Sequence, residues 1–68
     1  MSSLYFVSLL VRSNSQVPTK ISLYDGQTTY EEAMDLLLKT KEKYITFIAW
    51  IERYDGKGKE IVFQQCYV

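Results

Sequence analysis

One segment of this chain has helical periodicity, and two strand-like runs lie on each side of it. Apolar residues recur at helical spacing in residues 30–44, whereas the flanking runs are rich in aromatic and β-branched residues. The helical stripe comprises Tyr30, Ala33, Met34, Leu37 and Tyr44. Because a helix and a sheet each bury one apolar side, the two pack as layers around one core. The order therefore predicts a single α+β domain over residues 1–68: a ββαββ unit in which one helix packs on one face of a four-stranded, mostly antiparallel sheet.

The two runs before the helix differ in how their apolar residues alternate. Residues 4–11 are apolar on both faces, which favours a central strand. In residues 17–24, apolar and more polar residues alternate with a period of two, as in a half-exposed edge strand. The polar residues 12–16 between the two runs predict a turn.

The start of the helix carries its own sequence signal. Thr29 and Glu32 have the spacing of a capping box, in which the threonine hydroxyl accepts from the glutamate amide and the carboxylate reaches back to the cap. Acidic residues lie in the first turns and lysines in the last, an arrangement that the helix dipole stabilises. We therefore expect the helix to span residues 30–43.

Residues 45–51 and 60–68 are predicted to form a hairpin. Residues 55–58 supply turn chemistry between its arms, and Gly58 suits the left-handed position of a type I turn followed by a bulge. The pattern leaves open whether the third or the fourth strand of the chain lies beside the first.

The register of this hairpin decides which side chains reach the core. In the simplest register, Ile61 shares the helix-covered face with Ile51, and Val62 lies on the opposite face with Trp50. A slip of one residue in the second arm would exchange its two faces, so the alternative register stays open.

The sheet face away from the helix is predicted to be unusually apolar. Its residues would be Leu4, Phe6, Leu10, Tyr24, Ile48, Trp50, Val62 and Val68. Large contiguous apolar patches are rare on monomers and mark interaction surfaces. We therefore expect a homodimer, or a complex with another protein, whose contact residues are Phe6, Leu10, Ile48, Trp50 and Tyr54. In the competing interpretation the sheet curls and hides part of this face, with Trp50 packed under a loop or the C-terminus.

The size of the chain is a second reason to expect a partner. A domain of 68 residues buries only ~60% of the surface that its unfolded chain exposes. Cys66 is the only cysteine and histidine is absent, so neither an internal disulfide nor a structural zinc site can supply the missing stability. A lone thiol also predicts a cytoplasmic protein, and we expect Cys66 to be a small buried residue.

Composition and motifs argue against most other functions. Eight basic and eight acidic residues cancel, so nucleic acid is an improbable partner, and no run reaches the ~20 apolar residues of a membrane span. No nucleophile–base pair, phosphate-binding loop or metal-ligand spacing is present, so we expect no enzymatic activity, cofactor or metal. Six tyrosines support one alternative, a small-ligand or nucleic-acid binding module that stacks tyrosines of the open sheet face on its ligand.

Overall fold

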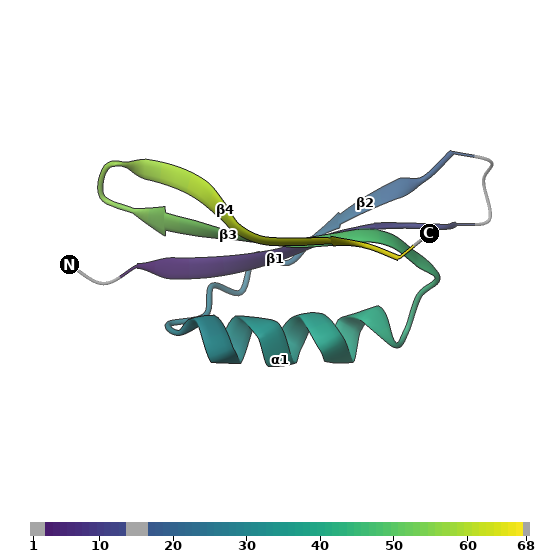
Figure 1. Ribbon diagram of the computed structural model, residues 1–68, viewed down its shortest axis with the longest axis horizontal. Helices are drawn as coiled ribbons and strands as arrows, with labels where there is room; N and C mark the ends of the chain where they lie inside the picture. Colours follow the sequence, from purple (N-terminus) through teal and green to yellow (C-terminus); the bar gives the residue numbers. More distant parts are fainter. Residues whose placement is uncertain (1–2, 14–16, 68) are drawn as a thin grey trace.

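A single helix lies beneath one face of a four-stranded sheet in the computed structural model, which describes residues 3–13 and 17–67 (Figure 1). The predicted turn residues 14–16 and the predicted open-face residue Val68 lie outside this range. The elements are β1 (Leu4–Val11), β2 (Thr19–Ser22), α1 (Tyr30–Lys41), β3 (Thr46–Asp55) and β4 (Gly58–Cys66). This order confirms the predicted ββαββ domain.

The sheet has the order β2-β1-β3-β4, and all its neighbouring strands are antiparallel. β1 is central, as its two apolar faces predicted, and β3 is the strand beside it. β2 is an edge strand but is shorter than predicted, with only four residues in the ladder. Because β1 separates β2 from β3, α1 carries the chain across β1 before β3 begins.

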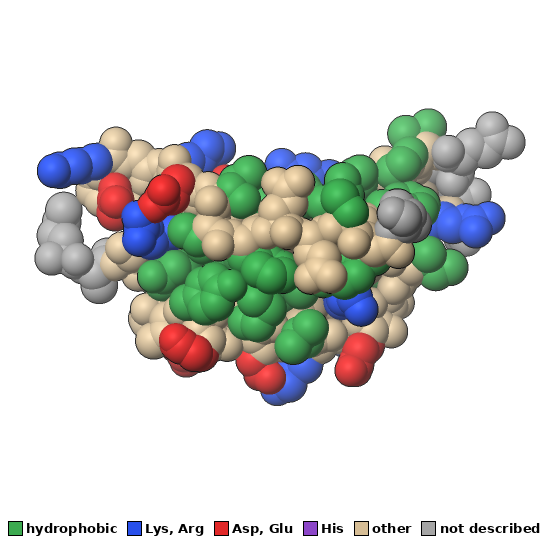
Figure 2. Space-filling view, viewed as in Figure 1, with side chains coloured by type: hydrophobic (Ala, Val, Ile, Leu, Met, Phe, Trp, Pro, Cys, Tyr) green, Lys and Arg blue, Asp and Glu red, His purple; other side chains and the backbone are tan. Residues whose placement is uncertain are grey.

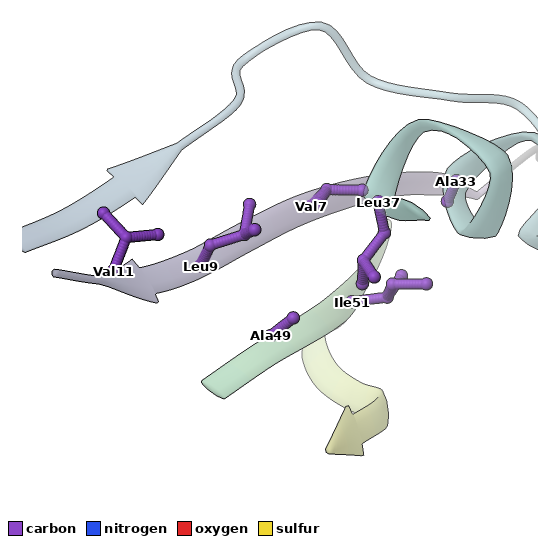
Figure 3. Close-up of a cluster of buried hydrophobic side chains, with 7 residues drawn as sticks. All are labelled: Val7, Leu9, Val11, Ala33, Leu37, Ala49 and Ile51. Carbon is purple, nitrogen blue, oxygen red and sulfur yellow. The ribbon is translucent and has the colours of Figure 1, made fainter. Parts of the chain in front are cut away.

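The hydrophobic core lies between α1 and the two central strands (Figure 3). Its seven buried residues are Val7, Leu9, Val11, Ala33, Leu37, Ala49 and Ile51, each at most 2% exposed. Ala33 and Leu37 are one helical turn apart, so the same side of α1 presents both to the sheet. Figure 2 shows further hydrophobic side chains gathered between sheet and helix, with acidic and basic side chains on the outer side of the helix.

The predicted N-cap of α1 is confirmed, with one change in its hydrogen bonds. The Glu32 amide donates to Thr29 Oγ1 at 3.1 Å. The Glu32 carboxylate accepts from the hydroxyls of Thr28 (2.8 Å) and Thr29 (3.1 Å), where the sequence predicted a bond to the cap amide. These hydroxyl bonds, Thr28 first, hold the pKa of Glu32 below its ordinary value of 4.5.

α1 ends at Lys41, two residues earlier than predicted. The Glu42 amide still donates to the Leu38 carbonyl, but the amides of Lys43 and Tyr44 donate to carbonyls three residues back. This tighter last turn directs the chain toward β3.

A β-bulge in β4 places Ile61 and Val62 on faces opposite to those predicted. Ile51 pairs with Phe63, but the next residue, Glu52, pairs with Ile61, so Val62 has no partner of its own. Val62 packs against the core, whereas Ile61 is 55% exposed. The prediction that Ile61 faces the helix and Val62 the open side was therefore wrong, because the extra residue shifts the alternation by one.

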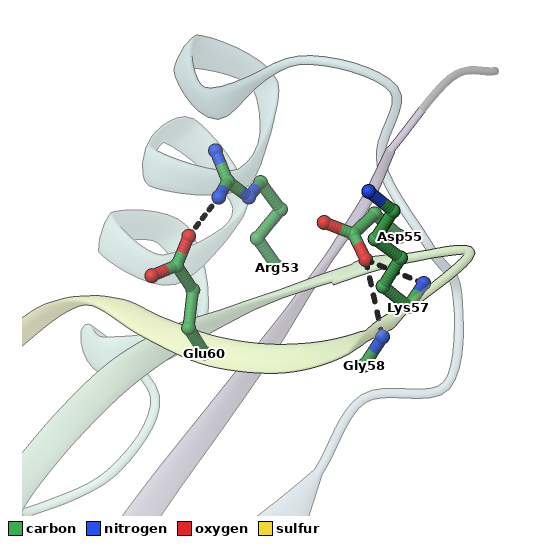
Figure 4. Close-up of polar contacts among 5 residues, drawn as sticks. All are labelled: Arg53, Asp55, Lys57, Gly58 and Glu60. Atoms are coloured by element: carbon green, nitrogen blue, oxygen red, sulfur yellow. Dashed lines mark hydrogen bonds and ion pairs between the residues drawn. The ribbon is translucent and has the colours of Figure 1, made fainter.

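The strands of the hairpin also continue further toward the turn than predicted. Asp55 pairs with Gly58, which leaves a two-residue loop. The Asp55 carboxylate accepts from the amides of Lys57 (2.8 Å) and Gly58 (3.1 Å), and Arg53 is paired with Glu60 across the strands (Figure 4). Gly58 has φ +155°, a backbone conformation that side-chain-bearing residues rarely adopt.

Candidate functional site

The face of the sheet opposite α1 has no helix or strand of the described chain over it (Figure 1). Alternate residues of β1 and β3 form the centre of this open face, in the cross-strand pairs Leu4–Tyr54, Phe6–Glu52, Ser8–Trp50 and Leu10–Ile48. β2 adds Lys20 beside Leu10 and Ser22 beside Ser8. β4 adds Lys59, Ile61, Gln64 and Cys66 beside the β3 residues.

The register brings all five predicted contact residues to this open face. Leu10 and Ile48 are direct cross-strand neighbours, and Trp50 follows Ile48 on the same strand. Four of the five are half-buried by their neighbours, and Tyr54 is 39% exposed. The face thus contains one apolar region, formed by Leu10, Ile48 and Trp50, that we call the apolar end of the open face.

At the opposite end, Phe6 is held between a tyrosine and a glycine. The rings of Phe6 and Tyr54 meet edge to face, with centroids 5.0 Å apart. A Cβ atom at Gly26 would lie 3.0 Å from Phe6 Cζ, so the loop after β2 approaches the ring as closely as a glycine permits.

A polar cluster around Glu52 interrupts the predicted apolar patch. Trp50 Nε1 donates to Glu52 Oε1 at 2.9 Å, and the Tyr54 hydroxyl donates to Oε2 at 3.4 Å. Lys59 Nζ lies 3.7 Å from Oε2, and the glutamate side chain is only 16% exposed. The expectation of a continuous apolar face was therefore wrong, because the middle of the face holds a carboxylate with its own donors.

A hollow of about 390 Å³ lies beside this cluster. It is lined by Phe6, Ser8, Lys20, Ser22, Leu23, Tyr24, Glu52, Tyr54 and Lys59. Tyr24 is 87% exposed at its border. The hollow therefore combines aromatic walls with both signs of charge, a lining that the sequence pattern did not reveal.

Cys66 is exposed, in contrast to the buried position that the sequence predicted. It lies on the edge strand β4, opposite Ile48 on the open face, where nothing in the described chain covers it. Within residues 3–13 and 17–67, no group of three or more His, Cys, Asp or Glu side chains could hold a metal ion. Over the same residues, no helix is long and apolar enough to cross a bilayer.

Comparisons of the chain with protein-family models, with curated proteins and with solved structures find no match. The class of the molecule is given by the fold itself: a small α+β domain whose antiparallel sheet has one face covered by a helix and one face open. The geometry of that open face is the basis for the proposals below.

Proposed function

We propose that this protein is a non-enzymatic interaction module that forms a homodimer through the open face of its sheet. The observation that carries the proposal is the apolar end of that face, where Leu10, Ile48 and Trp50 lie side by side with no helix or strand of the described chain over them. An antiparallel sheet that meets water on one side normally alternates apolar and polar residues. The two central strands depart from that pattern at this end.

A second copy of the chain is a suitable occupant on grounds of charge. The chain has no net charge, so two copies do not repel one another at long range. Each open face also carries both signs, Lys20 and Lys59 beside Glu52, so a facing copy can offer an opposite charge to each. Two such sheets would stack about 10 Å apart, with the helices outside.

The dimensions of the face limit the strength of this dimer. Four strands spaced about 4.8 Å apart and about eight residues long present roughly 500 Å² per copy. Two faces then bury roughly 1,000 Å², which is at the lower end for specific interfaces. We therefore expect a dimer that dissociates on dilution.

Light scattering over a dilution series tests the proposal. The expected result is a mass near twice 8.0 kDa at high concentration that falls toward the monomer mass on dilution. Ile48→Lys should remain monomeric, because it places a charge in the apolar end of the open face. Leu38→Lys is the matched control, since Leu38 is 49% exposed on α1, which lies on the other face of the sheet.

Circular dichroism would establish that both variants keep the native fold. A wild-type protein that stays monomeric at millimolar concentration would refute the homodimer. So would a pair of variants that weaken association equally, because the contact would then lie elsewhere on the molecule.

A further inference from the structure

The hollow on the open face has the dimensions of a small-molecule site. Its volume of about 390 Å³ falls within the range of roughly 300–1,000 Å³ found for ligand pockets. It is built by residues from every strand and from the segment that follows β2, all within one chain. Ligand binding there therefore does not require the proposed homodimer, and a second copy stacked on the open face would compete with the ligand for Lys20, Lys59 and Glu52.

Three aromatic rings border the hollow. Phe6 and Tyr54 are locked edge to face, and the close approach of Gly26 restricts the Phe6 ring further. Tyr24, by contrast, is 87% exposed and leaves its ring open to a stacking partner. Rigid aromatic walls of this kind suit a planar ring, because stacking is worth about 1–3 kcal/mol for each ring.

Two lysines approach the hollow from opposite ends. Lys20 lies on β2, yet its Nζ is 5.7 Å from the ring centroid of Trp50 on β3, so the side chain extends across β1. Lys59 approaches from the hairpin end, with Nζ 3.7 Å from Glu52 Oε2. Both lysines line the hollow together with Ser8 and Ser22.

The charges lining the hollow do not cancel. Lys59 is partnered by Glu52, whose Oε1 is already occupied by the Trp50 indole N–H. Lys20 forms no ion pair within the part of the chain that the structure describes. Two cations and one carboxylate leave one net positive charge beside the aromatic walls, which selects for an anion.

We propose that the hollow binds a small planar aromatic anion, a ring carrying one carboxylate or phosphate group. The ring would lie against Tyr24 and the Phe6–Tyr54 pair, and the anionic group would lie between the ammonium groups of Lys20 and Lys59. The Ser8 and Ser22 hydroxyls line the hollow as additional hydrogen-bond donors.

Amide chemical shifts of the labelled protein, followed during titration, test this site. Adenosine 5′-monophosphate and indole-3-acetate are the phosphate and carboxylate probes, and neutral adenosine and indole are their matched controls. The expected result is a saturable shift of hollow residues with at least one anion and a clearly weaker response to its neutral control. Which anion binds would show which group the lysines prefer.

Two pairs of variants separate ring binding from charge binding. Lys20→Gln should weaken the anion about fivefold, the worth of one exposed ion pair, whereas the helix-end control Lys43→Gln should not. Tyr24→Ala should weaken it about tenfold, whereas Tyr44→Ala, which removes a 44%-exposed tyrosine outside the hollow, should leave it unchanged.

The titration is repeated on the monomeric Ile48→Lys variant, so that failure of the ligand site and failure of the homodimer can be told apart. Binding that persists in this variant supports a site built by one chain. The proposal is overturned if neither anion gives a saturable shift, if the neutral controls bind equally well, or if the shifts spread over all the surface lysines.

Discussion

Glu32 and Glu52 show how position decides what the same side chain does in this protein. Glu32 is exposed and fixes the first turn of α1 through two threonine hydroxyls. Glu52 is largely covered, accepts from an indole and a phenol, and sets the polarity of the open face. The first role concerns helix stability, whereas the second concerns the polarity of the face on which we propose binding.

The N-cap makes helix stability depend on pH. Removal of the cap hydroxyl in Thr29→Ala should lower the free energy of unfolding by about 1 kcal/mol. Because the folded pKa of Glu32 is lowered, its carboxylate contributes stability that is present above the unfolded pKa and lost as pH falls through the folded pKa. Glu32→Gln should therefore be less stable than wild type at pH 7, and the difference should shrink in acid, below about 4.5.

Urea unfolding at pH 7 and at successively lower pH measures this difference. Glu42→Gln is the matched control, since Glu42 is the C-cap residue at the other end of α1. An acid-sensitive deficit of the same size in both variants would assign the effect to general charge and exclude the cap.

At the scale of elements, the bulge at Val62 marks where prediction from the sequence stopped. Alternation placed the residues of β1 and residues 48–54 of β3 on their correct faces, because every second residue along a strand returns to the same side. It failed at the start of β3, where the register shifts: Thr46 pairs with Val11 and is buried, whereas Ile45 is 62% exposed. The same counting failed in β4, since a bulge inserts one residue without a sequence mark of its own. Strand order was also unreadable, because both candidate neighbours of β1 were apolar.

The bulge can be tested by changing two adjacent residues to threonine. Val62→Thr should destabilise the fold by about 1 kcal/mol, because it turns a hydroxyl toward the half-buried flank of the core. Ile61→Thr should change stability by less than about 0.5 kcal/mol, since Ile61 is 55% exposed. Both threonines keep β-branching, so strand propensity is matched.

Urea unfolding in dilute protein compares the two variants without interference from self-association. If Ile61→Thr destabilised the protein more than Val62→Thr, Ile61 would be the buried residue. The simple alternation expected from the sequence would then hold, and the bulge would be contradicted.

Part of the open face was readable from the sequence and part was not. Trp50, Glu52 and Tyr54 are spaced by two on one strand, so their shared face was a signal that could have placed Glu52 among the aromatic residues. Lys20 and Lys59 come from opposite edge strands and meet this cluster only once the strand order is known. The hollow therefore required the three-dimensional structure.

At the scale of the whole molecule, the sheet is larger than the helix that covers it. The molecule measures 41 × 20 × 19 Å, and the β3–β4 turn projects past the start of α1 (Figure 1). α1 has 12 residues, about 18 Å, and packs on β1 and β3 while the edge strands extend beyond it. The other face of the sheet has no helix or strand of the described chain over it, so this small domain leaves further surface unburied there.

If a second copy covers that face, thermal stability must depend on protein concentration. Association stabilises the folded state by mass action, so above the dissociation constant a tenfold rise in concentration should raise the wild-type Tm by about 3–6 °C. Ile48→Lys should show a concentration-independent Tm, whereas Leu38→Lys, on the exposed side of α1, should follow the wild type. Differential scanning calorimetry over a hundredfold concentration range measures this, and a wild-type Tm that does not move would mean that the domain is stable as a single chain with its sheet face open to water.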